Sequence, residues 1–132
     1  MDIEVAEQAG RVPVTVIHIK GSVDTSTYDA FQASGEKAFN DGARYVLLDL
    51  TEVSHVTSAG FRAISQMFKL LRGNLSPRDS GMMSQGVGDG SYKSPNLKLL
   101  NPNPRVLEAL KLAGFDTFLE IYYKMDEAIA SF

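Results

Sequence analysis

The chain has 132 residues, which is the size of one domain built around a single core. Its 13 basic and 16 acidic side chains give a formal net charge of −3, so it lacks the positive surplus that nucleic-acid backbones or anionic lipids select. The absence of cysteine excludes disulfides, thiolate metal sites and a cysteine nucleophile, and it is typical of a cytoplasmic protein.

Neither secretion nor membrane insertion is indicated by the sequence. The first residues are acidic where a signal peptide would be basic. No apolar run approaches the roughly 20 residues that a membrane span needs. We therefore expect a soluble cytoplasmic protein without direct membrane insertion.

The first predicted element is a strand over residues 12–20, which pairs with residues 3–6 across a turn at 9–10. Its β-branched residues alternate between two faces, and one face carries Val14, Val16 and His18. Residues 21–26 then offer several N-cap candidates for a helix. The helix is amphipathic, with one apolar stripe made of Tyr28, Phe31, Ala38 and Phe39.

A short apolar run at residues 45–48 predicts a central strand that is buried on both faces, and Asp49 is expected to close it. A loop is expected over residues 51–56. The next apolar side chains recur at helical spacing and predict a helix over residues 58–72, which ends at residues 73–74; its stripe is Phe61, Ile64, Phe68 and Leu71.

The last third of the chain predicts a strand at residues 97–100 and then a helix that ends at Gly114. Asn103 is its expected N-cap and Pro104 its first helical residue. A strand at residues 118–121 and a short helix at 126–131 follow. Strands that alternate with helices of this length indicate an α/β fold with a largely parallel sheet.

Residues 74–95 interrupt this alternation. They are rich in Gly, Ser and Pro and show no apolar period, so we expect a flexible insertion within a single domain that spans residues 1–132. The glycines at 86, 88 and 90 do not fit a phosphate-binding loop, because Val87 and Tyr92 stand where such a loop needs glycine.

The sequence contains no constellation that indicates an enzyme. His18 and His55 are the only histidines; neither has a carboxylate at metal-ligand spacing, and we interpret them as a strand residue and a loop residue. Both precede Ser58, so the order of a hydrolase triad is missing. We expect no metal, no cofactor and no catalytic residue.

Ser58 stands at the predicted start of a helix, with Gly60 in the first turn. The simple interpretation is an N-cap, in which the hydroxyl accepts a backbone N–H. The alternative is a phosphoacceptor, because free N–H groups and the helix dipole tolerate the charge of a phosphate. Gly60 favours a close approach of another surface at this point. The residues alone leave both interpretations open.

Several stretches resemble, in order, the STAS domain family (sulphate transporter and anti-sigma factor antagonist). Residues 48–61, LDLTEVSHVTSAGF, are similar to its signature, a strand that ends in Asp-Leu, then a loop and a Ser-containing, Gly-containing helix start. Residues 21–24 resemble its Gly-acidic-hydrophobic-Asp turn. Its C-terminal third is matched by residues 99–106, 112–116 and 121–122. The resemblance implies a STAS-like α/β fold with a mixed, largely parallel sheet of about four to five strands and about four helices.

The single-domain members that this chain resembles are bacterial anti-sigma factor antagonists. The resemblance implies a non-enzymatic regulator of transcription, a phosphoprotein in a partner-switching pathway. It would bind an anti-sigma factor with serine kinase activity and be switched off by phosphorylation at Ser58. A serine phosphatase is a further candidate partner. The implied partner-binding residues are Asp24, Thr57, Ser58, Ala59, Gly60 and Phe61.

The chain departs from the family pattern at two positions, since Thr57 and Ser22 stand where acidic residues are usual. The alternative function is therefore a STAS scaffold subunit of a transporter or signalling complex that is never phosphorylated. Within the first interpretation, Thr57, Thr51 and Ser54 are alternative hydroxyl acceptors.

Overall fold

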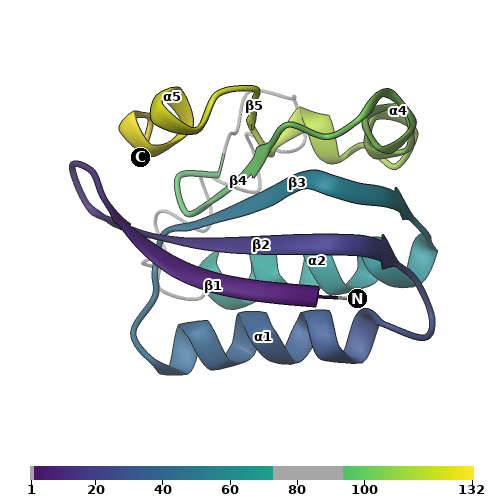
Figure 1. Ribbon diagram of the computed structural model, residues 1–132, viewed down its shortest axis with the longest axis horizontal. Helices are drawn as coiled ribbons and strands as arrows, with labels where there is room; N and C mark the ends of the chain where they lie inside the picture. The colour runs from purple at the N-terminus through teal and green to yellow at the C-terminus, as the bar shows by residue number, and fades with distance from the viewer. Residues whose placement is uncertain (1, 73–93) are drawn as a thin grey trace.

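The computed structural model describes residues 2–72 and 94–132 of the chain, with a mixed sheet in the order β1-β2-β3-β4-β5 (Figure 1). β1 pairs antiparallel with β2, and the other neighbours pair in parallel. This α/β sheet confirms the predicted fold class. The strands are β1 (Asp2–Ala9), β2 (Pro13–Val23), β3 (Val46–Val56), β4 (Leu97–Leu100) and β5 (Ile121–Tyr122).

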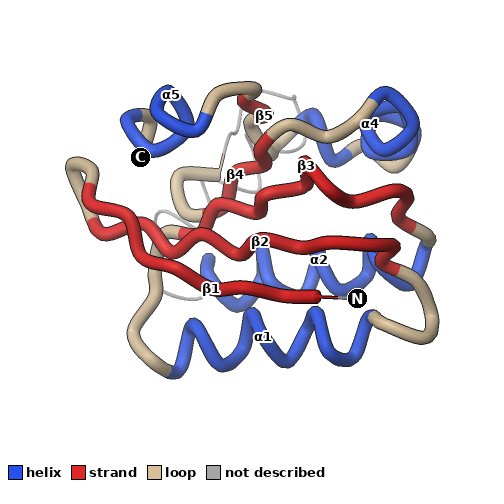
Figure 2. The backbone as a smooth tube through the Cα atoms, in the orientation of Figure 1, coloured by secondary structure: helices blue, strands red, loops and turns tan. Residues whose placement is uncertain are grey.

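Helices lie on both sides of this sheet, as Figure 2 shows. The helices α1 (Tyr28–Asn40) and α2 (Ser58–Arg72) run side by side along one face. The predicted start of the second helix at residue 58 is confirmed, whereas its predicted end at residues 73–74 lies outside the described residues. The helix α4 (Pro104–Leu112) and the short 3-10 helix η1 (Phe115–Thr117) pack into the same core as α1 and α2, whereas α5 (Met125–Ala130) lies on the other face. None of the helices in the described ranges is long and apolar enough to cross a membrane.

The apolar side chains form two clusters, one on each face of the sheet. The larger one joins the sheet to α1, α2, α4 and η1, and its fully buried members include Ile17, Leu48, Phe31 and Ile64. The smaller one lies beneath α5 and is made of Val14, Val16, Leu47, Leu100, Ala128 and Ile129. Leu47 and Leu48 thus face opposite cores, as expected for a central strand that is buried on both faces.

The third strand is longer than the sequence predicted. Asp49 does not end it, and the expected loop at 51–56 is the second half of β3. Here the side chains on the α2 side, including Val53 and Val56, are buried, whereas the polar residues around them are exposed or half-buried. Pairing with β2 continues to the end of both strands, with register shifts between His18 and Lys20 and between Gly21 and Val23, and these shifts break a regular alternation.

The structure also corrects the predicted start of the first helix and the predicted bounds of the last strand. Thr27 is the N-cap of α1, one residue beyond the candidates at 21–26, and no side-chain bond closes that cap. The last strand is β5 rather than residues 118–121, because η1 takes up the preceding residues and Phe118 packs on Phe68 at 4.8 Å between ring centroids. Of the expected insertion at 74–95, residues 74–93 lie outside the described part of the chain.

The prediction for the start of α4 is confirmed. Asn103 is the N-cap, its side-chain oxygen accepts the N–H of Val106 at 2.8 Å, and Pro104 opens the helix. Asn101, two residues earlier, has a positive φ of 52°, a conformation that asparagine tolerates better than most residues. The turn at residues 101–104 therefore has a defined shape.

Lys98 is a charged residue at the centre of β4, with only 4% of its surface exposed. Its ammonium group donates to the carbonyl and the hydroxyl of Ser131 at 2.9 and 3.0 Å and lies 3.5 Å from a Glu120 carboxylate oxygen. It also lies 4.8 Å from the ring centroid of Phe132. These contacts fasten the segment after α5 to the sheet.

Replacing Lys98 with Met should lower the free energy of unfolding by about 2 kcal/mol, because the half-buried acceptors of Ser131 lose a charged donor while the packing volume is kept. Urea unfolding followed by circular dichroism measures this loss. The matched control is Lys37→Met, since Lys37 is exposed and pairs with Asp41 only at the surface. It should change stability by less than about 0.5 kcal/mol; equal losses in the two variants would contradict a structural role for Lys98.

Candidate functional site

The connection between β3 and α2 consists of one residue, Thr57, and it is tied to the end of β2. The Thr57 N–H donates to the Val23 carbonyl at 2.9 Å, and the Thr57 hydroxyl donates to the same oxygen at 3.4 Å. Val23 also pairs with Val56 in the parallel ladder. Ser58 is therefore placed at the carboxyl ends of parallel strands, the edge where ligands of α/β sheets usually bind.

Gly60 is buried in the first turn of α2 against this same end of β2. A Cβ built on Gly60 would lie 2.7 Å from the Val23 carbonyl oxygen and 2.6 Å from a methyl group of Val56. A close approach to Gly60 was expected, and the structure shows one: the surface that approaches the glycine is formed by Val23 and Val56 of this chain. Only glycine lets the helix begin so near the strand, despite its low helix propensity.

Ser58 itself is exposed and is the first residue of α2. Thr57 holds the flanking position, since its carbonyl accepts the N–H of Phe61 at 2.9 Å. Within the described residues, no group hydrogen-bonds to the Ser58 hydroxyl, so the interpretation of Ser58 as the N-cap is wrong. Arg62 is exposed one turn later, at the spacing that brings two side chains together on a helix surface.

Asp24 lies directly after Val23 and shapes the neighbouring loop. Its carboxylate accepts the hydroxyl of Ser26 at 2.6 Å, the N–H of Ser26 at 2.9 Å and the hydroxyl of Ser22 at 3.2 Å. These bonds, with that of the Ser26 hydroxyl strongest, lower the pKa of Asp24 from its ordinary value. A fixed negative charge therefore stands on the loop beside the start of α2.

The other predicted partner-binding residues differ in exposure. Ala59 is half-buried, and Phe61 is half-buried because its ring stacks on Phe115 at 5.4 Å between centroids. Among the alternative acceptors, the Thr57 and Thr51 hydroxyls are engaged, with Val23 and with Asp49. Ser54 is exposed, as Ser58 is. The structure thus brings Asp24 and the start of α2, with its exposed Ser58, to one end of the sheet.

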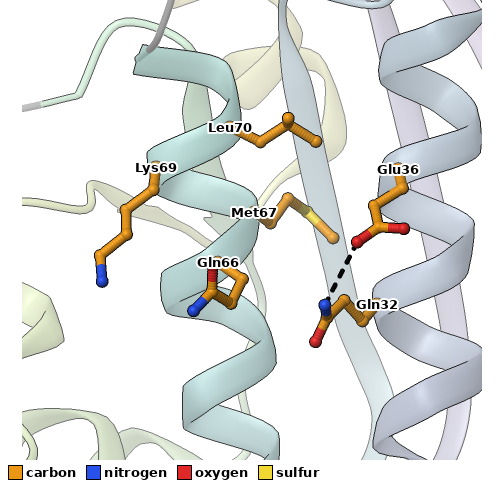
Figure 3. A pocket seen from close by; sticks show the side chains of 6 residues that line it. All are labelled: Gln32, Glu36, Gln66, Met67, Lys69 and Leu70. Carbon is orange, nitrogen blue, oxygen red and sulfur yellow. Dashed lines mark hydrogen bonds between the residues drawn. The ribbon is translucent and has the colours of Figure 1, made fainter.

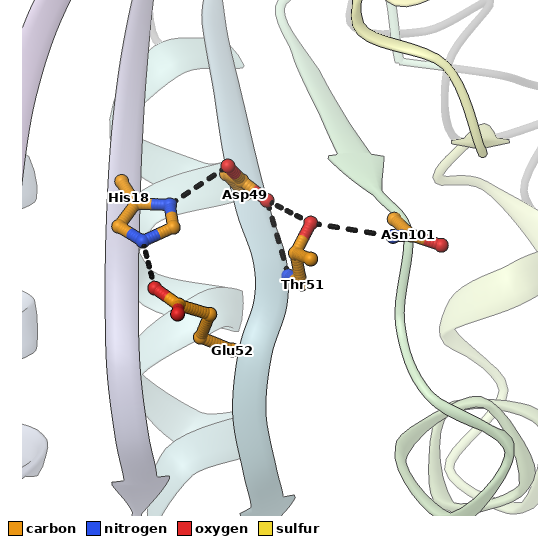
Figure 4. Close-up of polar contacts among 5 residues, drawn as sticks. All are labelled: His18, Asp49, Thr51, Glu52 and Asn101. Carbon is orange, nitrogen blue, oxygen red and sulfur yellow. Dashed lines mark hydrogen bonds and ion pairs between the residues drawn. The ribbon is translucent and has the colours of Figure 1, made fainter.

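A polar cluster that the sequence did not reveal lies on the sheet face that α5 leaves open (Figure 4). The two ring nitrogens of His18 lie 2.8 Å from Asp49 and 2.7 Å from Glu52. Asp49 also accepts the Thr51 hydroxyl, which in turn accepts the side chain of Asn101. His18 is the expected strand residue; His55 lies in β3 and is not the expected loop residue.

This geometry favours the imidazolium form of His18, because only that form can donate from both ring nitrogens to the two carboxylates. Hydrogen bonds to Asp49 first, and then to Glu52, raise the pKa of His18 above its ordinary value despite some desolvation. Burial raises the pKa of Asp49, but bonds from Thr51 and His18 outweigh burial and leave that pKa lowered. Glu4 faces His18 from β1 in the strand register and adds a further negative charge.

Other features that could hold a ligand lie away from Ser58 in the described residues. Among the described residues, no group of three or more His, Asp or Glu side chains is arranged to hold a metal ion. A hollow of about 290 Å³ lies between α1 and α2 (Figure 3), lined by side chains such as Gln32, Gln66 and Met67. It lies away from the start of α2, and the bond from Gln32 to Glu36 runs along its α1 wall.

The STAS domain family matches residues 3–75, which is more than half of the chain. The chain belongs to this family. It therefore carries a domain whose members include the anti-sigma factor antagonists, and its structural neighbours are of that kind.

Solved structures share the fold at low sequence identity. An anti-sigma factor antagonist from Mycobacterium paratuberculosis is 16% identical, with a TM-score of 0.70 over 98% of this chain and 93% of that one. The anti-sigma factor antagonist SpoIIAA in its unphosphorylated form is 18% identical, with a TM-score of 0.69 over 97% and 93%. The Bacillus cell fate determinant SpoIIAA in its phosphorylated form is 16% identical, with a TM-score of 0.61 over 97% and 96%. No curated protein matches by sequence.

Replacing Gly60 with Ala should destabilise the protein by about 1–3 kcal/mol, although alanine favours a helix, because the new methyl group meets a backbone carbonyl that cannot turn aside. Chemical denaturation gives the change. Gly35→Ala in α1 is the control, since its methyl group would meet only the end of the flexible Met67 side chain. A larger loss for Gly35→Ala would argue against the contact of Gly60 with Val23.

The free energy of unfolding should depend on pH through His18. A raised folded-state pKa means that the His18 contribution is complete below the unfolded pKa, about 6.5, and is lost as pH rises through the folded value. The loss caused by His18→Gln should thus be larger at about pH 6 than at about pH 9. Denaturation at several pH values tests this, with His55→Gln as control. A loss that grows with pH would contradict the imidazolium.

Proposed function

We propose that this chain is an anti-sigma factor antagonist that binds an anti-sigma factor with serine kinase activity and is switched off by phosphorylation at Ser58. The observation that carries the proposal is the accessible Ser58 hydroxyl, free of hydrogen bonds within the described residues, at the start of α2. Its setting in a STAS domain supports it, as does the likeness to SpoIIAA, which is known in unphosphorylated and phosphorylated forms. The expected place of action is the bacterial cytoplasm.

Phosphorylation would act electrostatically in this setting. A phosphoserine carries about two negative charges at neutral pH, and the free N–H groups of the first turn of α2 tolerate it in the unbound protein. In a complex that covers Ser58, the same charge would be desolvated. The Asp24 carboxylate, held ionised on the neighbouring loop, would oppose it. Binding would therefore be lost without any change in the fold.

The surface around Ser58 suits a binding protein rather than an enzyme. The ionisable residues nearest to Ser58 in the sequence are His55 and Arg62, and among the described residues no base is hydrogen-bonded to the serine hydroxyl to activate it. The phosphoryl donor and its catalytic groups would come from the kinase partner. A serine phosphatase would be needed to restore binding.

A second function is favoured by one specific observation. Thr57 stands where an acidic residue is usual in the family, and the first turn of α2 has no acidic residue. A STAS scaffold subunit of a transporter or signalling complex would need no phosphoacceptor. Purification from native membranes together with transporter subunits, rather than with a kinase, would favour this scaffold.

Ser58 should carry a phosphate in part of the protein isolated from its native host. Intact mass and fragmentation of the peptide that spans residues 45–62 measure this, in growing and in stressed cells. Ser58→Glu should weaken binding to a serine-kinase anti-sigma factor of the same genome by about tenfold or more, whereas Ser58→Ala should bind like the unphosphorylated protein. Calorimetry gives both affinities.

The matched control is Gln66→Glu, which adds one negative charge to an exposed position of the same helix, two turns from Ser58. It should leave the affinity nearly unchanged. If Ser58→Glu and Gln66→Glu weaken binding equally, the effect is one of total charge and the proposed switch at Ser58 is refuted. A well-covered peptide that is never phosphorylated would favour the scaffold.

A further inference from the structure

The side chain of Asn103, in the turn at residues 101–104, contacts the segment of β3 that precedes Ser58 in the sequence. The amide nitrogen of Asn103 donates to the Val53 carbonyl at 2.9 Å and lies 3.3 Å from the Ser54 carbonyl. The amide oxygen of the same side chain accepts the N–H of Val106. One asparagine thus joins the start of α4 to the last part of β3.

The end of β3 and the start of α2 are therefore held from two sides. On one side the Val23 carbonyl at the end of β2 holds Thr57, and on the other side Asn103 holds Val53 and Ser54. Ser58 follows directly. Its own side chain is bound by no group in the described residues, so its position depends on these two backbone anchors.

The turn that carries Asn103 is itself fixed. The Asn101 N–H donates to the Tyr122 carbonyl at 2.7 Å, and the Asn101 side chain lies 3.4 Å from the Thr51 hydroxyl, as Figure 4 shows. Asn101 holds a left-handed conformation directly before Pro102, which such a residue adopts only when its surroundings require it. The anchor on Val53 and Ser54 is therefore attached to β5 and β3, not to a free loop.

From these contacts we infer that Asn103 is a positioning residue for the phosphoacceptor serine. It acts by fixing the carbonyls of Val53 and Ser54 and so the path of the chain into Ser58. This inference rests on the proposed function, because Asn103 would control how Ser58 is presented to a kinase partner. Asn103 itself does not touch the hydroxyl.

The two roles of Asn103 can be separated by one substitution. Asn103→Asp keeps an oxygen that accepts the Val106 N–H, and a carboxylate is favourable at a helix N-terminus. It cannot donate, because an ionised carboxylate has no proton, and it would face the Val53 and Ser54 carbonyls with a negative charge. The cap is kept while the anchor is lost.

Amide hydrogen exchange by NMR on the purified protein is the first test of Asn103→Asp. Exchange of the Thr57 amide, which is bonded to Val23, should become at least tenfold faster. Exchange of the Leu107 amide, which is bonded to the Asn103 carbonyl in α4, should stay within about twofold of the wild type. Unchanged exchange at Thr57 would overturn the inference.

The matched control is Asn96→Asp, which removes the same kind of bond at the opposite end of β4. The Asn96 amide nitrogen donates to the Arg44 carbonyl at 2.9 Å, far along the strand from Ser58. The Asn96→Asp variant should leave the exchange of the Thr57 amide near the wild-type rate. If Asn96→Asp accelerates Thr57 exchange as much as Asn103→Asp does, the effect is general destabilisation and the inference fails.

The second test is the rate at which an anti-sigma serine kinase of the same genome phosphorylates Ser58. Asn103→Asp should lower kcat at least tenfold with a smaller change in KM, because the serine is bound but badly placed. A normal kcat beside faster Thr57 exchange would overturn the positioning role and leave the proposed function intact. If no kinase modifies the wild type, the proposed function fails, and the exchange comparison alone decides whether Asn103 holds the connection.

Discussion

The site depends on the meeting of the first turn of α2 with the carbonyl of Val23 at the end of β2. That oxygen accepts both the N–H and the hydroxyl of Thr57, and it leaves no room for a side chain at Gly60. The contact sets where the helix begins and turns Ser58 outward. Because Asp24 follows Val23 in the chain, the same contact places the acidic loop beside the helix start.

The STAS fold presents this surface on a rigid base. β2 and β3 are parallel neighbours, and their carboxyl ends lie together at the right in Figure 1. β4 runs in the same direction and ends level with Asp49, and the turn after it reaches this edge through Asn103. The chain leaves this edge into the Asp24 loop, into α2 and into the turn before α4. A partner that docks there meets three segments, each fixed by hydrogen bonds to its neighbours, and would pay little ordering entropy on binding.

The sequence predicted elements well where one periodicity dominates. The stripe from Phe61 to Leu71 located α2 and its start, and Asn103 with Pro104 located the start of α4. The sequence pattern did not reveal the second half of β3, because one face of the strand is open to solvent there and the polar residues from Thr51 to Ser54 resemble a loop. The cluster around His18 and the second role of Asn103 arise from tertiary contacts across 31 or more residues, for which no local pattern exists.

The antiparallel strand β1 forms one border of the sheet, and Val5 on it is 53% exposed. Its outer edge offers unpaired backbone groups along eight residues, the kind of border to which a second strand can add. Three of these residues are acidic: Asp2, Glu4 and Glu7. Two copies that joined along this border would bring six carboxylates together, so like-charge repulsion protects the open edge from self-association.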